Sequence, residues 1–311
     1  MGRKTLVFGS FVVDLMARTP HLPVPGETVK GSEFKMGPGG KGFNQAVAAF
    51  KAGAEVILAT KLGMDSFSEI ALNTMEKLGM DTRRIFRTER KDTGCALILV
   101  GEDSSQNEIV VVPGASLTIT EKEVDSLKEL IQECEFVLMQ LETNLDAVEQ
   151  VAEYAARSGT KVLLNPAPAA DLPEGLWGRI DVIIPNEVEA EYYTGIPVHS
   201  EVDAAKAADW FHSRGIADVI ITMADQGAYL SSSSGIREFV PAFSVDAVDT
   251  TGAGDAFCGG LLAALAEGKE RKEAVVFANA TAALSVQKIG TAPSMPDQKE
   301  IETFLATRVT N

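Results

Sequence analysis

Residues 249–255 read Asp-Thr-Thr-Gly-Ala-Gly-Asp, and they separate a strand-like segment from a helix-like one. Apolar residues alternate over 239–248, as they do in a β-strand. After the loop, Phe257, Leu261 and Leu265 recur every four residues, as on one face of a helix. The stretch therefore predicts a strand, a tight loop and a helix, which is the repeating unit of an α/β fold.

The small residues of this loop are suited to binding an anion. Gly252, Ala253 and Gly254 let backbone N–H groups approach an oxyanion closely, and a helix N-terminus adds about half a positive charge there. Asp255, on the expected first turn, could accept a proton from a hydroxyl group and orient that group for in-line attack on a phosphoryl group. A helix cap without catalytic function fits the same residues.

A second glycine-rich segment, residues 37–45, reads Gly-Pro-Gly-Gly-Lys-Gly-Phe-Asn-Gln and also precedes an apolar helical run. It does not match the loop of P-loop proteins, because Lys41 is followed by Gly42 rather than by Ser or Thr. Lys41 and Asn44 offer several hydrogen-bond donors and one acceptor, which suits a ligand with many hydroxyl groups. A tight turn with a solvated lysine is the alternative interpretation.

These two segments, in this order, resemble the signatures of the PfkB carbohydrate kinase family, in its ribokinase and deoxyribokinase branch. Further matches are Met-Gln-Leu-Glu at 139–142, Asn-Pro-Ala-Pro-Ala at 165–169 and Pro-Asn-Glu-Val-Glu-Ala-Glu at 185–191, so the resemblance covers nearly the whole chain. It implies transfer of the γ-phosphate of ATP to O5 of a pentose, D-ribose or 2-deoxy-D-ribose. The alternatives are a fructokinase-like or nucleoside-kinase-like enzyme and a noncatalytic sugar-binding regulator on the same fold.

The resemblance also implies a role for each matching residue. Asp255 would be the catalytic base, and the developing charge would be stabilised by Gly252, Ala253 and Gly254. The sugar would contact Asp14, Gly40, Lys41, Asn44, Glu142 and Asp255. ATP would contact Asn186, Thr222, Ala224, Gly227, Gly254 and Asn279.

Two cations are implied in the same way. Glu189 would hold Mg²⁺ through water, although Glu187, Glu189 and Glu191 also fit a solvated acidic helix face. K⁺, as an activator, would be bound by Asp249, Thr251, Ser285, Lys288, Gly290 and Ser294, mostly through backbone carbonyl groups.

Two residues depart from the ribokinase pattern near the sugar. Val12 stands where ribokinases usually have Asn, two residues before Asp14, and Phe43 stands where the signature usually has Ala, which adds bulk beside Lys41. A sugar hydroxyl buried against Val12 without a partner would cost about 1–3 kcal/mol, on the order of ten- to a hundredfold in selectivity. The substitution favours a deoxy sugar, unless Val12 only packs beneath the lid.

Charge and cysteine content narrow the function classes. A formal charge of −16 argues against a nucleic-acid or anionic-membrane surface, because such partners need clustered Lys and Arg. The three cysteines, Cys95, Cys134 and Cys258, are widely spaced, which suits reduced thiols in the cytoplasm, and Cys258 is interpreted as a small buried residue. None of the three histidines has metal-ligand spacing, and neither a secretion signal nor a membrane span is expected.

Strand and helix patterns alternate along the chain. Thr120 and Glu123 form a capping box before a helix carrying Val124, Leu127 and Ile131. Further helices are expected over 145–158 and 202–214, with strands over 136–141, 161–165, 182–185 and 219–222. Such repeats predict a mostly parallel sheet covered by helices on both faces, a three-layer α/β sandwich.

Two segments break this alternation, roughly 15–35 and 94–112, where 95–100 and 109–112 look like paired strands. They resemble the small β lid of the family, inserted into a single domain that spans residues 1–311. The exposed faces of a small sheet need cover, and the resemblance implies that two lids cover each other, so we expect a homodimer formed through the lid.

Overall fold

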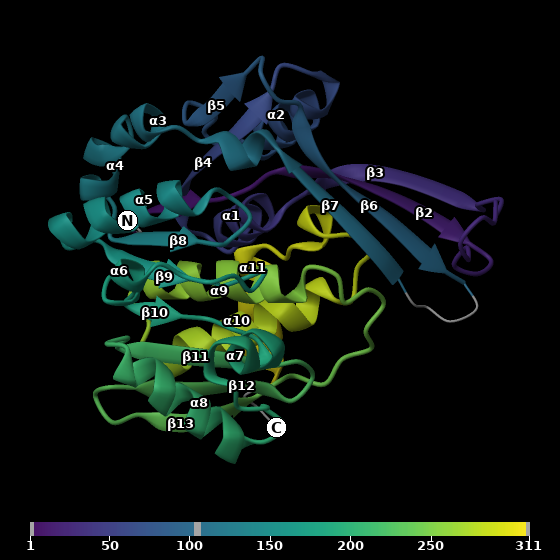
Figure 1. Ribbon diagram of the computed structural model, residues 1–311. Coiled ribbons are helices and arrows are strands. Elements are labelled where there is room, and N and C mark those ends of the chain that lie inside the picture. The colour runs from purple at the N-terminus through teal and green to yellow at the C-terminus, as the bar shows by residue number, and fades with distance from the viewer. Residues whose placement is uncertain (1–2, 103–106, 309–311) are drawn as a thin grey trace.

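The protein is built around a large, mostly parallel β-sheet (Figure 1). The computed structural model describes residues 3–102 and 107–308. Over these residues the large sheet has nine strands, in the order β13 (Arg237–Pro241), β12 (Gly227–Ser232), β11 (Asp218–Met223), β10 (Val182–Ile183), β9 (Lys161–Leu164), β8 (Phe136–Met139), β1 (Lys4–Phe8), β4 (Glu55–Gly63) and β5 (Ile85–Thr88). The β11–β12 and β12–β13 pairs are antiparallel, and the other adjacent pairs are parallel.

Helices cover both faces of this sheet, which confirms the predicted three-layer α/β sandwich. One face, called here the α9 side, packs against α1 (Lys41–Lys51), α2 (Ser66–Leu78), α9 (Ala253–Glu267), α10 (Arg271–Ser285) and α11 (Gln298–Arg308). The other face, the α5 side, packs against α3 (Glu121–Asp125), α4 (Lys128–Glu133), α5 (Leu145–Ser158), α6 (Glu174–Trp177), α7 (Glu187–Thr194) and α8 (Glu201–Ser213). Two short 3₁₀ helices, η1 (Ala115–Thr118) and η2 (Ala292–Ser294), lie in connecting segments.

The strands bury apolar side chains on both faces because successive residues of a strand point in opposite directions. In β1, Val7 packs into the core of the α9 side, while Leu6 and Phe8 pack into the core of the α5 side. The remaining central strands repeat this alternation, so the sheet separates two distinct hydrophobic cores.

The strand order reverses between β1 and β8. From β1 the chain passes through α1 to β4 on one side, whereas β8 is followed by α5 and then by β9 on the other side. Right-handed crossovers in opposite directions place their helices on opposite faces, which leaves a crevice at the carboxyl ends of the two strands. The fold therefore predicts a ligand site beyond the ends of β1 and β8.

A four-stranded second sheet forms the lid and projects from the main body (Figure 1). Its order is β3 (Glu33–Gly39), β2 (Val12–Thr19), β6 (Thr93–Gly101) and β7 (Asn107–Gly114). The predicted pairing of 95–100 with 109–112 is confirmed, since β6 and β7 are antiparallel with Cys95 opposite Val112. Residues 103–106 of the predicted lid segment lie outside the described residues.

One predicted strand is wrong in its extent. The alternating pattern over 239–248 predicts a strand that reaches the loop at 249–255, but β13 ends at Pro241 and residues 242–249 form no strand. Pro241 lies opposite Gly227, the first residue of β12, so no partner strand continues beyond it. A longer connection thus leads from the edge of the sheet to α9.

The predicted helix through Val124, Leu127 and Ile131 is interrupted. Thr120 and Glu123 form the expected capping box, yet α3 ends at Asp125 and α4 begins only at Lys128. All three apolar side chains are nevertheless buried in the α5-side core, so the pattern identified the buried face but not the break.

Over residues 3–102 and 107–308, no helix combines the length and apolar character that a membrane crossing requires.

Candidate active site

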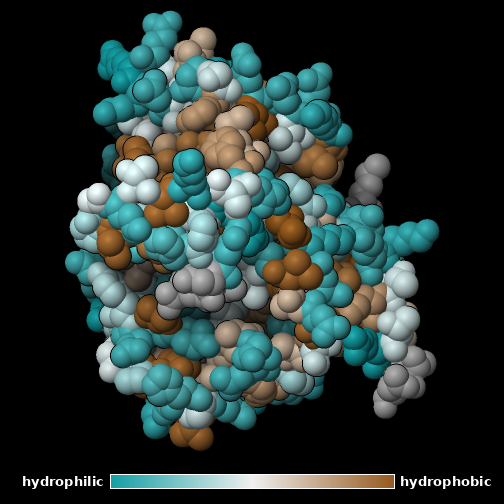
Figure 2. Space-filling model, turned by 90° about the vertical axis from the view of Figure 1, so that its right-hand side faces the viewer, coloured by the Kyte–Doolittle hydropathy of each residue, from teal (hydrophilic) through white to brown (hydrophobic). Residues whose placement is uncertain are grey.

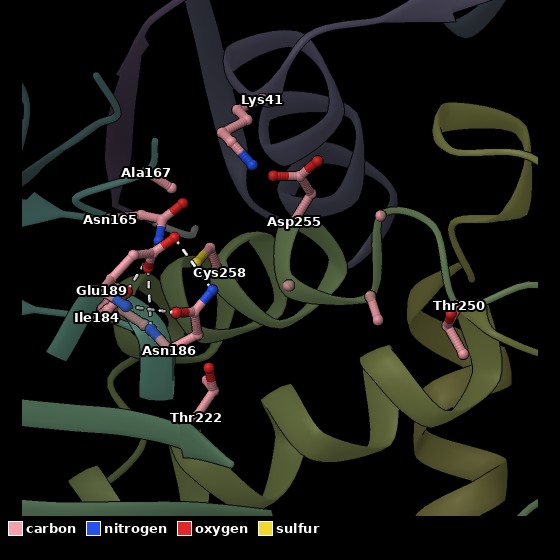
Figure 3. Close-up of a pocket in the computed structure, with 13 residues that line it drawn as sticks. Lys41, Asn165, Ala167, Ile184, Asn186, Glu189, Thr222, Thr250, Asp255 and Cys258 are labelled. Atoms are coloured by element: carbon pink, nitrogen blue, oxygen red, sulfur yellow. Dashed lines mark hydrogen bonds between the residues drawn. The ribbon is translucent and has the colours of Figure 1, made fainter. Parts of the chain in front are cut away.

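A polar cavity of about 220 Å³ lies at the carboxyl ends of β9, β10 and β11, displaced from the crevice predicted beyond β1 and β8 (Figure 3). Its walls come from the ends of the central strands, the start of α1 and the start of α9. The residues that line it are Lys41, Asn165, Ala167, Ile184, Asn186, Glu189, Thr222, Thr250, Gly252, Ala253, Gly254, Asp255 and Cys258. The structure therefore brings together predicted residues from both glycine-rich segments and from the segment 185–191.

The loop before α9 depends on a glycine. Gly252 caps the helix with a φ of 80°, a left-handed conformation that residues with a side chain rarely adopt. The N–H of Ala253 donates to the carbonyl of Thr250 at 3.2 Å, within the loop itself. The first turn of α9, including Gly254 and Asp255, faces the cavity with the positive end of the helix dipole.

Asp255 is held in place by two side-chain amides of α1. The residue as a whole is only 7% exposed. The Asn44 amide nitrogen donates to Oδ2 at 3.0 Å, and the Gln45 amide nitrogen donates to Oδ1 at 2.9 Å. Each carboxylate oxygen therefore has a fixed donor and keeps further acceptor capacity towards the cavity.

Lys41 provides a positive charge opposite this carboxylate, and Figure 3 shows its side chain directed towards Asp255. Burial alone would lower the pKa of Lys41, but the nearby carboxylates of Asp255, Glu142 and Glu189 outweigh that effect, and the net pKa is raised. Lys41 is therefore a cation at the cavity wall throughout the physiological pH range.

Glu142 connects the end of β8 with the start of α1. Its Oε2 accepts hydrogen bonds from the Ser10 hydroxyl at 2.5 Å and from the Lys41 backbone N–H at 2.9 Å. Asp14 faces the same region from β2. Burial raises the pKa of Asp14 to about 6, and the negative charges of Glu142 and Asp255 act in the same direction.

Val12 and Phe43, the two departures from the ribokinase pattern, occupy different surroundings. Val12 is two residues from Asp14 on β2, so the two side chains share one face of the lid. Phe43 packs edge-to-face on Phe11, with ring centroids 5.0 Å apart, inside the α9-side core. The prediction that Phe43 adds bulk beside Lys41 is therefore wrong, because side chains two positions apart on a helix point to different sides.

Asn186 and Glu189 form a reciprocal capping box at the start of α7. Asn186 Oδ1 accepts from the Glu189 N–H at 2.8 Å, and Glu189 Oε2 accepts from the Asn186 N–H at 2.9 Å. Burial raises the pKa of Glu189. The solvated acidic face is a wrong interpretation for this residue, because Glu189 lines the cavity while Glu191 is exposed.

The other residues predicted to contact ATP do not all line the cavity. Thr222 lines the cavity at the end of β11. Ala224 follows it with a left-handed φ of 45°, and Gly227 begins β12, but neither residue lines the cavity. Asn279, on α10, donates its amide to the carbonyls of Val240 and Pro241 at 3.2 and 3.1 Å, also outside the cavity wall.

Part of the predicted K⁺ set lies in one place. The Asp249 carboxylate accepts from the N–H groups of Thr251 at 3.0 Å and Gly290 at 2.9 Å. Burial raises the pKa of Asp249, but these hydrogen bonds outweigh it and the net pKa is lowered. Ser285 and Ser294 direct their hydroxyl groups to nearby backbone carbonyls, and Lys288 reaches Glu300 at 2.9 Å.

Three residues close to Asp255 have no role in the sequence-based prediction. Gln45, Gln140 and Asn165 occur in the quoted segments, yet nothing in the sequence indicates that their side chains meet near Asp255. The position of Asn165 directly after β9 is the available signal, since ligands collect at strand ends. Cys258 lines the cavity, and burial raises the pKa of its thiol well above the ordinary range, as expected of a buried filler.

Comparison with known proteins identifies relatives over almost the entire chain. The family model for "pfkB family carbohydrate kinase" matches residues 3–298. The ribokinase of Haemophilus influenzae is 43% identical over 304 residues, which cover 97% of this chain and 99% of that protein. The deoxyribokinase of Salmonella typhi is 36% identical over 301 residues, covering 96% and 98%. The solved structure of Arabidopsis thaliana ribokinase complexed with ribose and ATP aligns with a TM-score of 0.90 at 28% identity, covering 98% and 99%.

The raised pKa of Asp14 predicts that this residue destabilises the folded protein. Because its folded-state pKa of about 6 lies above the ordinary 3.8, stability is lost as the pH rises from about 4 to about 6. We expect Asp14→Asn to raise the free energy of unfolding by about 1–3 kcal/mol above pH 6, with the gain shrinking towards pH 4. Urea unfolding of the variant and of the unaltered protein, at about pH 4 and above pH 6, measures this difference in the free energy of unfolding.

The matched control is Asp246→Asn, at an exposed carboxylate, which should change the free energy of unfolding by less than about 0.5 kcal/mol. An Asp14→Asn variant that is no more stable than the unaltered protein at alkaline pH contradicts the prediction.

Proposed function

Because the chain belongs to the PfkB family of carbohydrate kinases, we propose that it transfers the γ-phosphate of ATP to O5 of a pentose, D-ribose or 2-deoxy-D-ribose. It is an ATP-dependent sugar kinase of ribokinase type. The observation on which the proposal rests is the buried Asp255 carboxylate at the start of α9, in one cavity with Lys41 and the glycine loop.

In the proposed reaction, Asp255 acts as the general base. Its carboxylate accepts the proton of the sugar O5 hydroxyl while the oxygen attacks the γ-phosphorus in line with the departing ADP. The Asn44 and Gln45 amides keep the carboxylate oriented, and its remaining lone pairs face the cavity. Transfer then needs little covalent chemistry from the protein beyond this proton transfer and positioning.

The negative charge of the transferring phosphoryl group is stabilised by the start of α9 and by Lys41. The backbone N–H groups of Gly252 and Gly254 and the dipole of α9 provide fixed positive potential at the cavity, whereas the Ala253 N–H is engaged by the Thr250 carbonyl. Lys41 adds a full charge close to the base. Such prearranged groups stabilise the transition state without reorganising during the reaction.

The sugar is bound between the lid and the main body. Asp14 approaches from β2, while Gly40, Lys41 and Asn44 lie at the start of α1 and Glu142 lies after β8. Asn44 Oδ1 is buried and has no hydrogen-bond partner within the described residues. A sugar hydroxyl group would satisfy it, which supports a role of Asn44 in binding the sugar as well as in orienting Asp255.

ATP lies on the other side of the cavity, towards Asn186 and Thr222, and beyond it towards Ala224, Gly227 and Asn279. The oxygen-rich wall at Asn186 and Glu189 fits Mg²⁺, which prefers oxygen ligands and retains water. When bound, Mg²⁺ neutralises phosphate charge. Glu189 is already engaged by Asn186, so its contact with the ion is proposed to pass through water.

K⁺ is proposed as an activator bound beside the glycine loop. The Asp249 carboxylate ties residues 249–251 to Gly290 and offers oxygen ligands between the two segments. The site adjoins Gly252 through Thr291, whose side chain would be 3.3 Å from a Cβ at position 252. An ion bound at this point would stabilise the conformation of the glycine loop.

The choice between the two pentoses is proposed to depend on Val12. Its side chain shares a face of β2 with Asp14 and is 4% exposed, outside both core clusters. It offers no hydrogen bond to the sugar 2-hydroxyl, and 2-deoxy-D-ribose lacks that group. We therefore propose that the enzyme accepts 2-deoxy-D-ribose readily, with D-ribose as the competing substrate.

A second copy of the chain is the proposed partner, and the cytoplasm is the proposed location. The lid exposes apolar side chains on the face opposite to Asp14, where Phe34 is 66% and Val110 is 60% exposed. Figure 2 views the molecule from the side on which the lid projects and shows apolar residues among polar ones there. Three free cysteines, Cys95, Cys134 and Cys258, support a reducing compartment.

Asp255→Asn should remove the base while keeping the shape of the site. We expect kcat to fall by about 10²–10⁴-fold with sugar binding retained, because an amide cannot accept the hydroxyl proton. ADP release and calorimetric sugar titration measure the two effects. The exposed Glu191→Gln is the control and should retain full activity. Full activity of Asp255→Asn would show that this mechanism is wrong.

Val12→Asn should supply an amide to the 2-hydroxyl group. We expect the ratio of kcat/KM for D-ribose to that for 2-deoxy-D-ribose to rise by about ten- to a hundredfold. The assay compares both sugars, with D-fructose and adenosine as further acceptors, in the presence of ATP, Mg²⁺ and K⁺. An unchanged ratio means that Val12 only packs beneath the lid, and turnover of fructose or adenosine alone would overturn the pentose assignment.

Val110→Asp should weaken the proposed dimer, because it places a charge in the apolar face of the lid. Sedimentation at micromolar concentration is expected to show a dimer for the unaltered chain and a monomer for the variant. The control, Glu108→Asp, keeps the charge of an exposed lid residue. A monomeric unaltered chain contradicts the proposal.

A further inference from the structure

Gln45 lies at the centre of a chain of side-chain amides that ends at Asp255. Its amide nitrogen donates to Asp255 Oδ1 at 2.9 Å and also to Asn165 Oδ1 at 3.0 Å. Its amide oxygen accepts from the Gln140 amide nitrogen at 2.6 Å. Three elements therefore meet here, since Gln45 is on α1, while Gln140 and Asn165 directly follow β8 and β9.

A backbone carbonyl fixes the direction of every amide in this chain. Asn165 donates its amide nitrogen to the carbonyl of Ile184 at 2.8 Å, so its oxygen must face Gln45. Gln45 must then present its nitrogen to Asn165 and to Asp255, and its oxygen to Gln140. Reversing any one amide would bring two donors or two acceptors together, so the network has a single consistent arrangement.

The network is shielded from water. Gln45 and Gln140 are both 0% exposed. Gln140 is packed so closely against Gly9 that a Cβ at position 9 would lie 2.1 Å from its amide oxygen. With neither space nor solvent for another partner, a buried glutamine loses its hydrogen bonds outright if the network is broken.

Gln45 does not belong to the cavity wall. Asp255 and Asn165 line the cavity, but neither Gln45 nor Gln140 does. In this respect Gln45 differs from Asn44, which holds the other oxygen of Asp255 and has a free acceptor for a ligand. Any effect of Gln45 on the reaction must therefore pass through the groups that it contacts.

We propose that Gln45 is a positioning residue, which locks the Asp255 carboxylate in the orientation for proton acceptance, with Gln140 and Asn165 as its supports. The inference rests on the proposed function of Asp255. Two donors on different oxygens prevent rotation of the carboxylate about its Cβ–Cγ bond, so one lone pair stays aimed at the sugar hydroxyl. Loss of the Gln45 donor frees that rotation and leaves sugar and ATP contacts in place.

Gln45→Met tests the inference because it keeps the length of the side chain and removes its donor. We expect kcat to fall by about ten- to a hundredfold, while the dissociation constants of sugar and ATP stay within about threefold. Gln140→Met removes only the donor that orients Gln45, and we expect a smaller fall of about three- to tenfold. The exposed Gln132→Met is the control for the substitution itself and should be unaltered in both respects.

A double-mutant cycle with Asp255→Asn distinguishes positioning from a general structural role. If Gln45 acts through Asp255, Gln45→Met should cause no further loss of the residual rate in the Asp255→Asn background. Losses that multiply in the double variant overturn the inference, as does a fall in sugar affinity that matches the fall in kcat. Thermal unfolding accompanies each measurement. If Gln45→Met fails to fold, an unchanged kcat of Gln140→Met is sufficient to overturn it.

Failure of the proposed function would look different. It would appear as full activity of Asp255→Asn, or as absence of turnover of every sugar by the unaltered enzyme. If only the inference fails, the unaltered enzyme still turns over sugar and Asp255→Asn still loses activity. The discrepancy then appears only when Gln45 or Gln140 is replaced.

Discussion

Burial of the Asp255 carboxylate is the constraint on which the rest of the site depends. An ionised carboxylate that leaves water must be compensated by donors or by opposite charge, and here both come from the start of α1. The first turn of α9 adds its dipole. α1 and α9 must therefore pack closely, and the reversal of strand order between β1 and β8 provides the space in which their ends converge.

The sequence predicts the components of this arrangement better than their contacts. The alternating patterns give the parallel sheet, its helices and the paired strands of the lid, because burial on one or both faces leaves a periodic signal. The strand predicted over 239–248 is too long. A hydrophobic pattern does not reveal that the antiparallel partner β12 has no residue to pair beyond Gly227, which lies opposite Pro241. Most of the site was predicted by resemblance, but the amide network was not. Its members lie far apart in the chain and meet only through tertiary packing.

The charge distribution reconciles an acidic protein with an anionic substrate. The formal charge is −16, yet ATP is proposed to bind where the start of α9 and Lys41 provide positive potential. The charges of Glu142 and Asp255 add to the raised pKa of Asp14, and Asp255 acts in the same direction on the pKa of Glu189, which Lys41 opposes. Hydrogen bonds donated by the proposed polyhydroxylated sugar would favour the ionised form of Asp14 and Glu189.

The separation of the lid from the nine-stranded sheet has an evolutionary consequence. The residue proposed to distinguish one pentose from the other, Val12, lies on the eight-residue strand β2, whereas the base and the anion-binding loop belong to the main body. Sugar preference can thus drift by exchange of a short, locally paired segment while the machinery of phosphoryl transfer is inherited unchanged. A lineage of such enzymes could thus come to accept new sugars without passing through an inactive ancestor.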